Sequence, residues 1–477
     1  MNERTDGPRG RGRAPTVARL PRGPRSADPA RRAAYDLLQA VRERDAYANL
    51  TLPRLLSERG LTGRDAAFAT ELGYGTLRAY GTWDQVLDAC IDRPGDQVEP
   101  AVRDVLRLGA HQVLAMRTPP HAAVSATVNL CREALGPAPA GFVNAVLRKV
   151  AAADLDGWTA QLAPDREADR KGHLAFRHAH PEWIVRAFAE VLSRDWDEVE
   201  ALLAADNVPA RVTLAARPGR CSRDELIAAG ATATPWSPYG AVLSAGHPGD
   251  LPQVRSGAAG VQDEGSQLVA LAFAAAPIDG PDELWLDACA GPGGKAALLH
   301  GLAAQRGARL LAAEVAPHRA RLVANSLAGA PVPAWVVAAD ATSPPWPAGR
   351  FDRVLVDVPC TGLGALRRRP EARWRRQPAD VGRLFDLQLA LLIKAVAAVR
   401  PGGVVGYVTC SPHRVETIGV LHAAYEAVAR GKAQVDLLDA PALLPDVPDA
   451  GDGPFLQLWP HRHGTDAMFM ALLRRER

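Results

Sequence analysis

The first third of the chain carries apolar residues at helical spacing. Between Ala34 and Val41, apolar side chains fall at positions i, i+3, i+4 and i+7, which form one face of a helix. The same spacing recurs in three later segments, 102–116, 124–135 and 142–150. Because strand-like alternation is nearly absent, we predict an all-α domain over residues 29–157.

The middle of the chain, residues 158–260, combines two patterns. Up to about residue 208 it remains helical, and His180-Pro181 is expected to open a helix near Glu182. Beyond that point, short β-type pieces at 211–215 and 240–244 stand among Gly and Pro residues. We therefore expect a helical connector followed by a small α+β insert.

From residue 261 to 477, apolar runs alternate with helical stretches. The runs expected to form strands are 284–288, 309–313, 334–338, 353–357 and 404–409, with a closing strand at 467–473. This alternation predicts a doubly wound, Rossmann-like α/β domain with right-handed crossovers. Ligands bind such sheets beyond the carboxyl ends of the strands, so we expect the chemistry just after these runs.

The amino-acid composition gives only a weak indication of a nucleic-acid partner. The formal net charge is only +3, but Arg outnumbers Lys by 51 to 5. Arg pairs with phosphate and stacks on bases, although a genome-wide preference for Arg codons would give the same count. Residues 1–28, rich in Arg, Gly and Pro, are predicted to be a disordered basic tail, either a solvated leader or a contact for RNA phosphates.

Several classes of protein are disfavoured. No apolar run approaches the roughly 20 residues of a membrane span, and the start lacks the apolar stretch of a secretory signal. The six cysteines are far apart and form no CxxC pair, so neither a metal site nor a disulfide framework is expected. We expect a cytoplasmic monomer that uses no metal and binds no membrane.

A glycine-rich turn follows the first of the expected strands. Its residues are Cys289, Ala290, Gly291, Pro292, Gly293, Gly294 and Lys295. Such a turn lets the backbone approach a ligand, but its spacing matches neither the dinucleotide fingerprint nor the phosphate loop. Glu314 and Asp340 end the next two strands, where acids suit ribose hydroxyls and an adenine amino group. Each acid alone is better explained as a turn or cap residue, but together with the turn they predict an adenosine-bearing cofactor without a pyrophosphate.

Two cysteines stand just after the last two parallel strands. Cys360 follows Asp357 in Asp-Val-Pro-Cys, and Cys410 lies in Thr-Cys-Ser. A thiolate that adds to carbon 6 of cytosine makes carbon 5 nucleophilic enough to accept a methyl group from a sulfonium donor. Asp357 would face the cytosine ring, and a helix after Cys410 is expected to favour the thiolate. Cys90, Cys131 and Cys221 are expected to be buried fillers.

An arginine-rich segment follows Cys360. It contains the predicted RNA-binding residues Arg367, Arg368, Arg369, Arg373, Trp374 and Arg375. We expect the guanidinium groups to hold phosphates and Trp374 to stack a base. A target base must leave its stack to reach the thiol, so loop or single-stranded RNA is expected.

At these motifs the chain resembles the RsmB/Sun family of ribosomal RNA 5-methylcytosine methyltransferases, over nearly all of residues 30–477. The segment 142–148 (FVNAVLR) is similar to NusB-type RNA-binding domains, and 260–267 (GVQDEGSQ) to the family's entry into the catalytic domain. The resemblance implies that residues 289–295 with Glu314, Asp340 and Asp357 line an S-adenosylmethionine site. It also implies that Cys410 is the nucleophile, that Cys360 assists release of the product, and that the substrate is 16S rRNA.

Three positions depart from the family pattern. Gly291 stands where Ala is usual, Thr417 stands where Asn is common, and 466–469 reads Asp-Ala-Met-Phe in place of Asp-Gly-Phe-Phe. None of them changes a cysteine. Two alternatives stay open, namely a tRNA 5-methylcytosine methyltransferase and a non-catalytic NusB-like RNA-binding factor.

Overall fold

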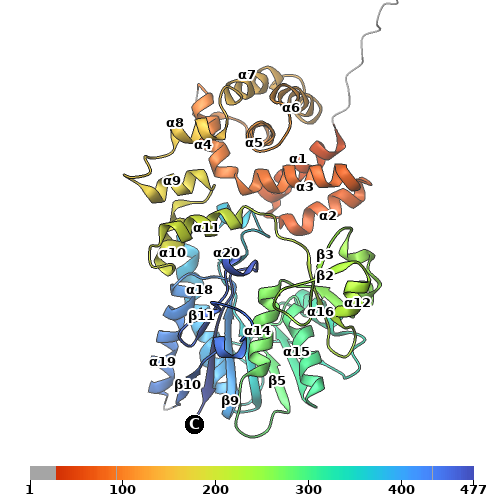
Figure 1. The fold of residues 1–477 in the computed structure, drawn as a ribbon, viewed down its shortest axis with the longest axis vertical. Helices are drawn as coiled ribbons and strands as arrows, with labels where there is room; N and C mark the ends of the chain where they lie inside the picture. The colour runs from red at the N-terminus through yellow and green to blue at the C-terminus, as the bar shows by residue number, and fades with distance from the viewer. Residues whose placement is uncertain (1–27, 93, 432, 477) are drawn as a thin grey trace, which may run out of the picture.

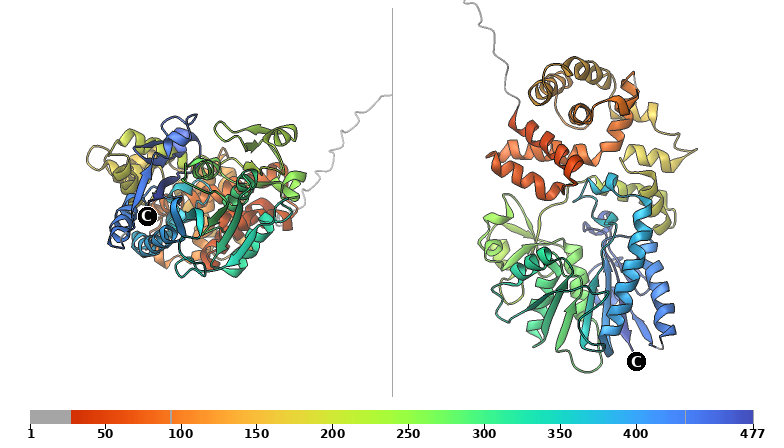
Figure 2. Two further views of the ribbon diagram at one scale, coloured as in Figure 1. Left: turned by 90° about the horizontal axis from the view of Figure 1, so that it is seen from below. Right: turned by 180° about the vertical axis from the view of Figure 1, so that it is seen from behind.

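The computed structural model describes residues 28–92, 94–431 and 433–476, so the predicted basic tail lies almost wholly outside the described residues. A helical domain sits on top of an α/β domain, and the chain passes between them through a short run of helices (Figure 1). Figure 2 shows the same two tiers from behind. Each helix of the described residues is too short or too polar to cross a lipid bilayer.

The upper tier is the predicted all-α domain. Its helices are α1 (Pro29–Arg44), α2 (Ala48–Glu58), α3 (Gly63–Arg78), α4 (Tyr80–Cys90), α5 (Pro100–Leu114), α6 (Pro120–Leu135), α7 (Ala140–Val150) and α8 (Leu155–Leu162). Asp28 starts the first of these by accepting a hydrogen bond from the amide of Ala30, with Pro29 in the first turn. The apolar stripe of α1 is buried at Ala34, Leu37 and Leu38, as its spacing predicted.

Three more helices connect the tiers, and a small sheet follows them. The helices are α9 (Arg170–Arg177), α10 (Glu182–Val191) and α11 (Trp196–Asp206). Strands β1 (Thr213–Ala216), β2 (Ala231–Ala233), β3 (Gly240–Leu243) and β4 (Ala259–Val261) then pair in the antiparallel order β2-β3-β1-β4 beside α12 (Arg223–Ala228). This is the expected α+β insert.

The lower tier is a doubly wound sheet with a mixed edge. Its parallel strands are β5 (Leu284–Asp287), β6 (Arg309–Glu314), β7 (Trp335–Ala338), β8 (Phe351–Asp357) and β9 (Val399–Thr409). They lie in the order β7-β6-β5-β8-β9, and β13 (Phe469–Arg475) then pairs antiparallel with β9. Strand order reverses between β5 and β8, which is where ligands bind in such sheets.

Helices cover both faces of this sheet. One face packs against α14 (Glu264–Ala275), α15 (Gly294–Gln305) and α16 (Pro317–Leu327), and the other against α18 (Pro378–Ala398) and α19 (Val420–Arg430). Neighbouring residues of β5 show the alternation, because Trp285 joins the first core and Leu286 the second. The carboxyl ends of β5, β6, β8 and β9 are thereby fixed on one rim, below the helical domain (Figure 1).

Candidate active site

The glycine-rich turn connects β5 to α15 in a shape that depends on two glycines. Gly293 has a φ of +115°, which side chains with a Cβ rarely adopt. A Cβ on Gly291 would lie 2.1 Å from Oε2 of Glu314, so the backbone and this carboxylate approach more closely than Ala allows without a shift. Gly291, the first of the three departures from the family pattern, therefore contacts Glu314, the acid predicted to bind ribose.

Glu314 and Asp340 both retain acceptor capacity. Glu314 is 3% exposed and accepts hydrogen bonds from the amides of Gly291 (3.2 Å) and Ala316 (3.0 Å). Asp340 is exposed and accepts from the amide and hydroxyl of Thr342, which lower the pKa of its carboxyl. A carboxylate offers about four acceptor positions, so each acid can still receive hydroxyl or amino groups.

Asp287, at the end of β5, provides an observation that tests the cofactor assignment. Its Oδ2 atom is buried and has no hydrogen-bond partner among the described residues. Burial and the nearby charge of Asp357 raise the pKa of Asp287 to about 7. A buried acceptor of this kind needs a partner, and a polar ligand in the turn would supply one. The residues therefore fit an adenosine-bearing cofactor.

Lys295 and Asp357 join the turn to the rim of the sheet. Lys295 Nζ donates a hydrogen bond to Asp357 Oδ2 at 2.9 Å, and the two side chains are 11% and 27% exposed. Burial alone would lower the pKa of Lys295, but the Asp357 carboxylate and the nearby Cys410 outweigh it and raise this pKa. Lys295 therefore stays charged at neutral pH.

The two strand-end cysteines face each other. The Sγ atoms of Cys360 and Cys410 are 3.4 Å apart. The hydrogen bond from Cys360, with the charges of Lys295 and Arg369, lowers the pKa of Cys410 in spite of its burial and of Asp357. The hydrogen bond to Cys410 and burial raise the pKa of Cys360 well above its ordinary value. The pair is thus polarised, so that the thiolate is favoured at Cys410 and the proton at Cys360.

Three side chains, rather than the predicted start of a helix, lower the pKa of Cys410. The next helical turn begins at Val415, five residues after Cys410. Cys360, Lys295 and Arg369 take that role because the fold brings their strand-end and loop positions together. The remaining strand-end thiol, Cys289, has a pKa raised well above its ordinary value by burial and by Asp287.

A buried glutamate holds the Cys360 loop, and the sequence analysis did not assign it a role. Glu416 is fully buried and accepts hydrogen bonds from the amide of Thr361 (2.8 Å), the hydroxyl of Thr361 and Nε2 of Gln388 (3.0 Å). The only sequence signal was an acid six residues after Cys410. Thr417, the second departure from the family pattern, donates to the carbonyl oxygen of His413 at 3.1 Å.

Gly364 fixes the Cys410 loop from the other side. Its amide donates to the carbonyl of Cys410 (2.8 Å), and its carbonyl accepts from the amide of Ala467 (2.8 Å). A Cβ on Gly364 would lie 2.1 Å from the oxygen of Ala467 and 2.7 Å from that of Cys410. Three separate segments therefore meet at this glycine.

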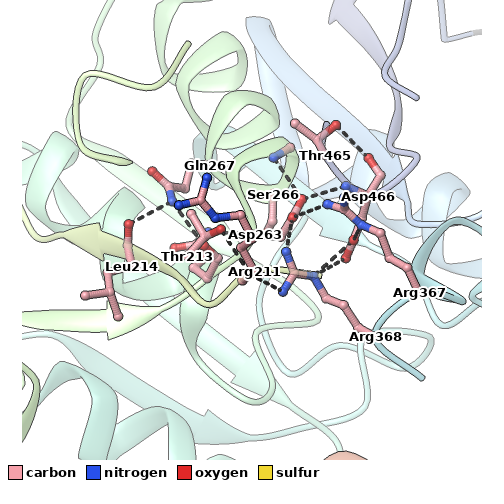
Figure 3. Close-up of polar contacts among 12 residues, drawn as sticks. Arg211, Thr213, Leu214, Asp263, Ser266, Gln267, Arg367, Arg368, Thr465 and Asp466 are labelled. Atoms are coloured by element: carbon pink, nitrogen blue, oxygen red, sulfur yellow. Dashed lines mark hydrogen bonds and ion pairs between the residues drawn. The ribbon is translucent and has the colours of Figure 1, made fainter. Parts of the chain in front are cut away.

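Arg367 and Arg368 bind carboxylates within the protein, which differs from their predicted contact with phosphates. Both guanidinium groups pair with both Asp263 and Asp466, as Figure 3 shows. Burial alone would raise the pKa of Asp263, but the two arginines outweigh it and lower this pKa. Because four charges cancel in a site only 8–23% exposed, this cluster tethers the loop after Cys360 to α14 and to the segment before β13.

The next part of the arginine-rich segment also turns inward. Arg373 is fully buried and donates to the carbonyl of Ala179 (2.9 Å) and to Oδ1 of Asn207 (2.8 Å). Trp374 donates its indole N–H to the carbonyl of Arg78 (3.0 Å), and Arg375 donates to that of Ala46 (3.1 Å). The structure thus uses these predicted RNA contacts to join the tiers, and only Arg369 remains exposed.

Three further cysteines lie in other parts of the fold, and a cavity lies beside the glycine-rich turn. Cys90, Cys131 and Cys221 are buried, as expected of fillers. Among the described residues, no cluster of His, Cys, Asp and Glu side chains could hold a metal ion. A cavity of about 620 Å³ adjoins the glycine-rich turn at Pro292 and Gly294, and residues of the insert such as Arg217 form its opposite wall.

Known proteins resemble this chain in both tiers. A family model described as 16S rRNA methyltransferase RsmB/F matches residues 275–474, and a NusB family model matches 28–152. A putative methyltransferase of Mycobacterium tuberculosis is 54% identical over 95% of this chain and 98% of that protein. A probable ribosomal RNA small subunit methyltransferase B of Bacillus subtilis is 30% identical over 93% and 98%.

Solved structures share the fold. The crystal structure of PH0851 aligns with a TM-score of 0.75 at 20% identity, covering 95% of this chain and 99% of that one. NSun6 from Pyrococcus horikoshii, solved with SFG, aligns with a TM-score of 0.52 at 17% identity, covering 62% and 98%. With the curated relatives matched over nearly their whole length, this chain belongs to the RsmB/F family of S-adenosylmethionine-dependent methyltransferases.

Proposed function

We propose that this protein methylates carbon 5 of a cytosine in small-subunit rRNA through a covalent bond between Cys410 and carbon 6 of the base. The observation that carries the proposal is the 3.4 Å approach of the Cys360 and Cys410 sulfurs beside the Lys295–Asp357 pair. One rim of the sheet carries two polarised thiols, a buried cation and the glycine-rich turn. This combination suits nucleophilic attack on a base followed by group transfer.

The residues that would hold S-adenosylmethionine are those of the turn, 289–295, together with Glu314, Asp340 and Asp357. Glu314 has acceptor positions left for ribose hydroxyls, and Asp340 for an adenine amino group. When bound, the cofactor supplies an electrophilic methyl group on a sulfonium centre.

Cys410 begins the reaction. Its thiolate adds to carbon 6 of cytosine, and the electrons of the carbon 5–carbon 6 double bond move toward the ring nitrogen and carbonyl. Lys295 and Asp357 lie beside Cys410, where the cation stabilises the negative charge that develops on the ring. Carbon 5 would then take the methyl group as the bond from that group to the cofactor sulfur breaks. A general base accepts the carbon 5 proton, and the electrons of that C–H bond restore the carbon 5–carbon 6 double bond and expel Cys410 as thiolate.

Cys360 is proposed to assist the release of the methylated RNA, as the family resemblance implies. Its raised pKa keeps it protonated, so it can donate a hydrogen bond to the sulfur of Cys410 as that atom leaves carbon 6 with negative charge. The hydrogen bond lowers the pKa of the leaving thiol, and a thiol of lower pKa leaves faster.

The proposed substrate is 16S rRNA, and the helical tier supports this choice. The NusB family model matches that tier, and several relatives are named ribosomal RNA small subunit methyltransferase B. This substrate implies a cytoplasmic enzyme, which we propose acts as a monomer.

Mapping of 5-methylcytosine tests the proposal directly. Purified protein is incubated with S-adenosylmethionine and unmodified 16S rRNA or tRNA transcripts, and the products are read by bisulfite sequencing. We expect one methylated cytosine in 16S rRNA. Methylation confined to tRNA would overturn the substrate, and isothermal titration that detected no S-adenosylmethionine binding would overturn the enzyme in favour of a non-catalytic RNA-binding factor.

A further inference from the structure

An exposed aromatic residue of the helical tier lies beside the loop that follows Cys360. Tyr47 immediately precedes α2 and is 52% exposed, and Leu50, three residues further on, is 68% exposed. Helix α2 lies on the side of the helical tier that faces the lower tier (Figure 1). The amide of Ala48 donates to Glu371 (3.3 Å), and Arg375 donates to the carbonyl of Ala46 (3.1 Å), so both neighbours of Tyr47 are fixed to that loop.

Two arginines of the loop approach the ring of Tyr47. The guanidinium carbon of Arg369 is 5.9 Å from the ring centroid, and that of Arg375 is 5.8 Å from it. Of the six arginines between 367 and 376, five donate hydrogen bonds to carboxylate, amide or carbonyl oxygens of the protein. Arg369 is exposed, and within the described residues its guanidinium makes neither a hydrogen bond nor an ion pair.

Arg369 is connected to Cys410 through backbone hydrogen bonds and through its charge. Its amide donates to the carbonyl of Ala365, and the adjacent Gly364 donates to the carbonyl of Cys410. Its positive charge is one of those that lower the pKa of Cys410. The Arg369 guanidinium therefore lies near enough to influence the charge on Cys410, and the ring of Tyr47 lies beside this guanidinium.

We infer that Tyr47 stacks on an unpaired nucleotide that flanks the target cytosine, while Arg369 binds a phosphate of the same strand. The inference rests on the proposed function. An aromatic face accepts any base, and a free guanidinium supplies the charge that RNA backbone requires, so the occupant that this corner suits is single-stranded RNA. The helical tier then contributes a side chain to substrate positioning at the active site.

A second exposed pair of the same kind serves as a matched control. Arg309 lies 5.5 Å from the ring centroid of Trp335, which is 45% exposed. These residues begin β6 and β7, at the opposite end of the strands from the rim that carries the cysteines. Substitution of Trp335 therefore removes an exposed aromatic side chain at a distance from the proposed contact between RNA and Tyr47.

The test compares Tyr47→Ala, Tyr47→Phe, Arg369→Gln and Trp335→Ala by steady-state methylation of an unmodified 16S rRNA transcript and by filter binding at several salt concentrations. For Tyr47→Ala we expect the KM for RNA to rise about tenfold, with kcat and the Kd for S-adenosylmethionine unchanged. Tyr47→Phe and Trp335→Ala should match the wild type. Arg369→Gln should reduce the salt slope of RNA binding by about 0.7, the contribution of one single-strand phosphate.

The result that would overturn the inference is a KM for Tyr47→Ala equal to that of Trp335→Ala. A defect in Tyr47→Phe as large as in Tyr47→Ala would also overturn it, because the hydroxyl and not the ring would then matter. A wild-type protein that methylates no rRNA would instead refute the proposed function, whatever the Tyr47 variants bind.

Discussion

Two buried charge clusters involve the strand ends and loops that carry Cys360 and Cys410, and they differ in how their charges are paired. In the part of the chain that the structure describes, Lys295 pairs with Asp357 alone, near Cys410 and near an oxygen of Asp287 that has no partner there. In the second cluster, Asp263 and Asp466 each bind both Arg367 and Arg368 (Figure 3). The Lys295–Asp357 cluster keeps hydrogen-bonding capacity for a ligand. In the second cluster, each charged group is paired with two groups of opposite charge within the protein.

Because of this difference, we expect the first cluster to act on the reaction and the second to stabilise the fold. A buried ion pair whose members lack further partners can respond to a charge that appears on a substrate, because a low local dielectric strengthens that interaction. A closed network of two acids and two arginines responds little, but it fixes the loops that its members occupy. We therefore expect substitutions in the first cluster to change rates and those in the second to change stability.

The largest effect is expected at the cysteines. Cys410→Ala should abolish methyl transfer because no other described thiol has a lowered pKa, while Cys360→Ala should accumulate a covalent protein–RNA adduct because release is impaired. Denaturing gels of reactions with 16S rRNA report both results. An adduct that persists in Cys410→Ala and is lost in Cys360→Ala would reverse the two roles.

Removal of one member of the Arg–Asp cluster should mainly cost stability. Arg368→Met leaves two buried carboxylates with a single arginine, and loss of one partner from a buried ion pair costs about 3–5 kcal/mol. Urea unfolding followed by circular dichroism measures the change. As a control, Arg383→Met removes an arginine that is 75% exposed and should have little effect. If the two variants had the same free energy of unfolding, the Arg–Asp cluster would not contribute to stability.

Substitution of Lys295 should instead shift the pH dependence of the reaction. Without this cation the pKa of Cys410 rises, so the thiolate is lost at a higher pH as the solution is acidified. In Lys295→Met, the acidic limb of kcat/KM should move to higher pH, with about a tenfold loss at neutral pH for each unit of the shift. An unmoved limb with lower activity at every pH would mean that Lys295 acts only in binding.

The smallest effect is expected at Gly291. In Gly291→Ala the new Cβ meets Oε2 of Glu314, the end of a flexible side chain that can move aside. We expect the Kd for S-adenosylmethionine to change less than about threefold, since the acid keeps free acceptor positions. Isothermal titration checks this, and a loss of tenfold or more would show that Glu314 cannot move.

The rim of the sheet was predictable from the sequence because parallel strands bring their carboxyl ends together. Asp357 ends an apolar run, and Cys360 and Cys410 each follow one, so their shared edge required only the alternation of strands and helices. The roles of Glu416 and Arg373 could not be found in this way, since their partners come from distant segments. For the same reason an arginine-rich run was predicted as an RNA surface, whereas most of it packs between the tiers.

The proposed bond between Cys410 and the base can be tested most directly with 16S rRNA transcribed with 5-fluorocytidine. The fluorine blocks loss of the carbon 5 substituent and therefore traps the adduct after methyl transfer. Digestion and mass spectrometry of the trapped complex identify the modified cysteine. We expect a methylated fluorocytidine on the peptide that contains Cys410, and the same adduct on the peptide that contains Cys360 would contradict the proposed role of Cys410.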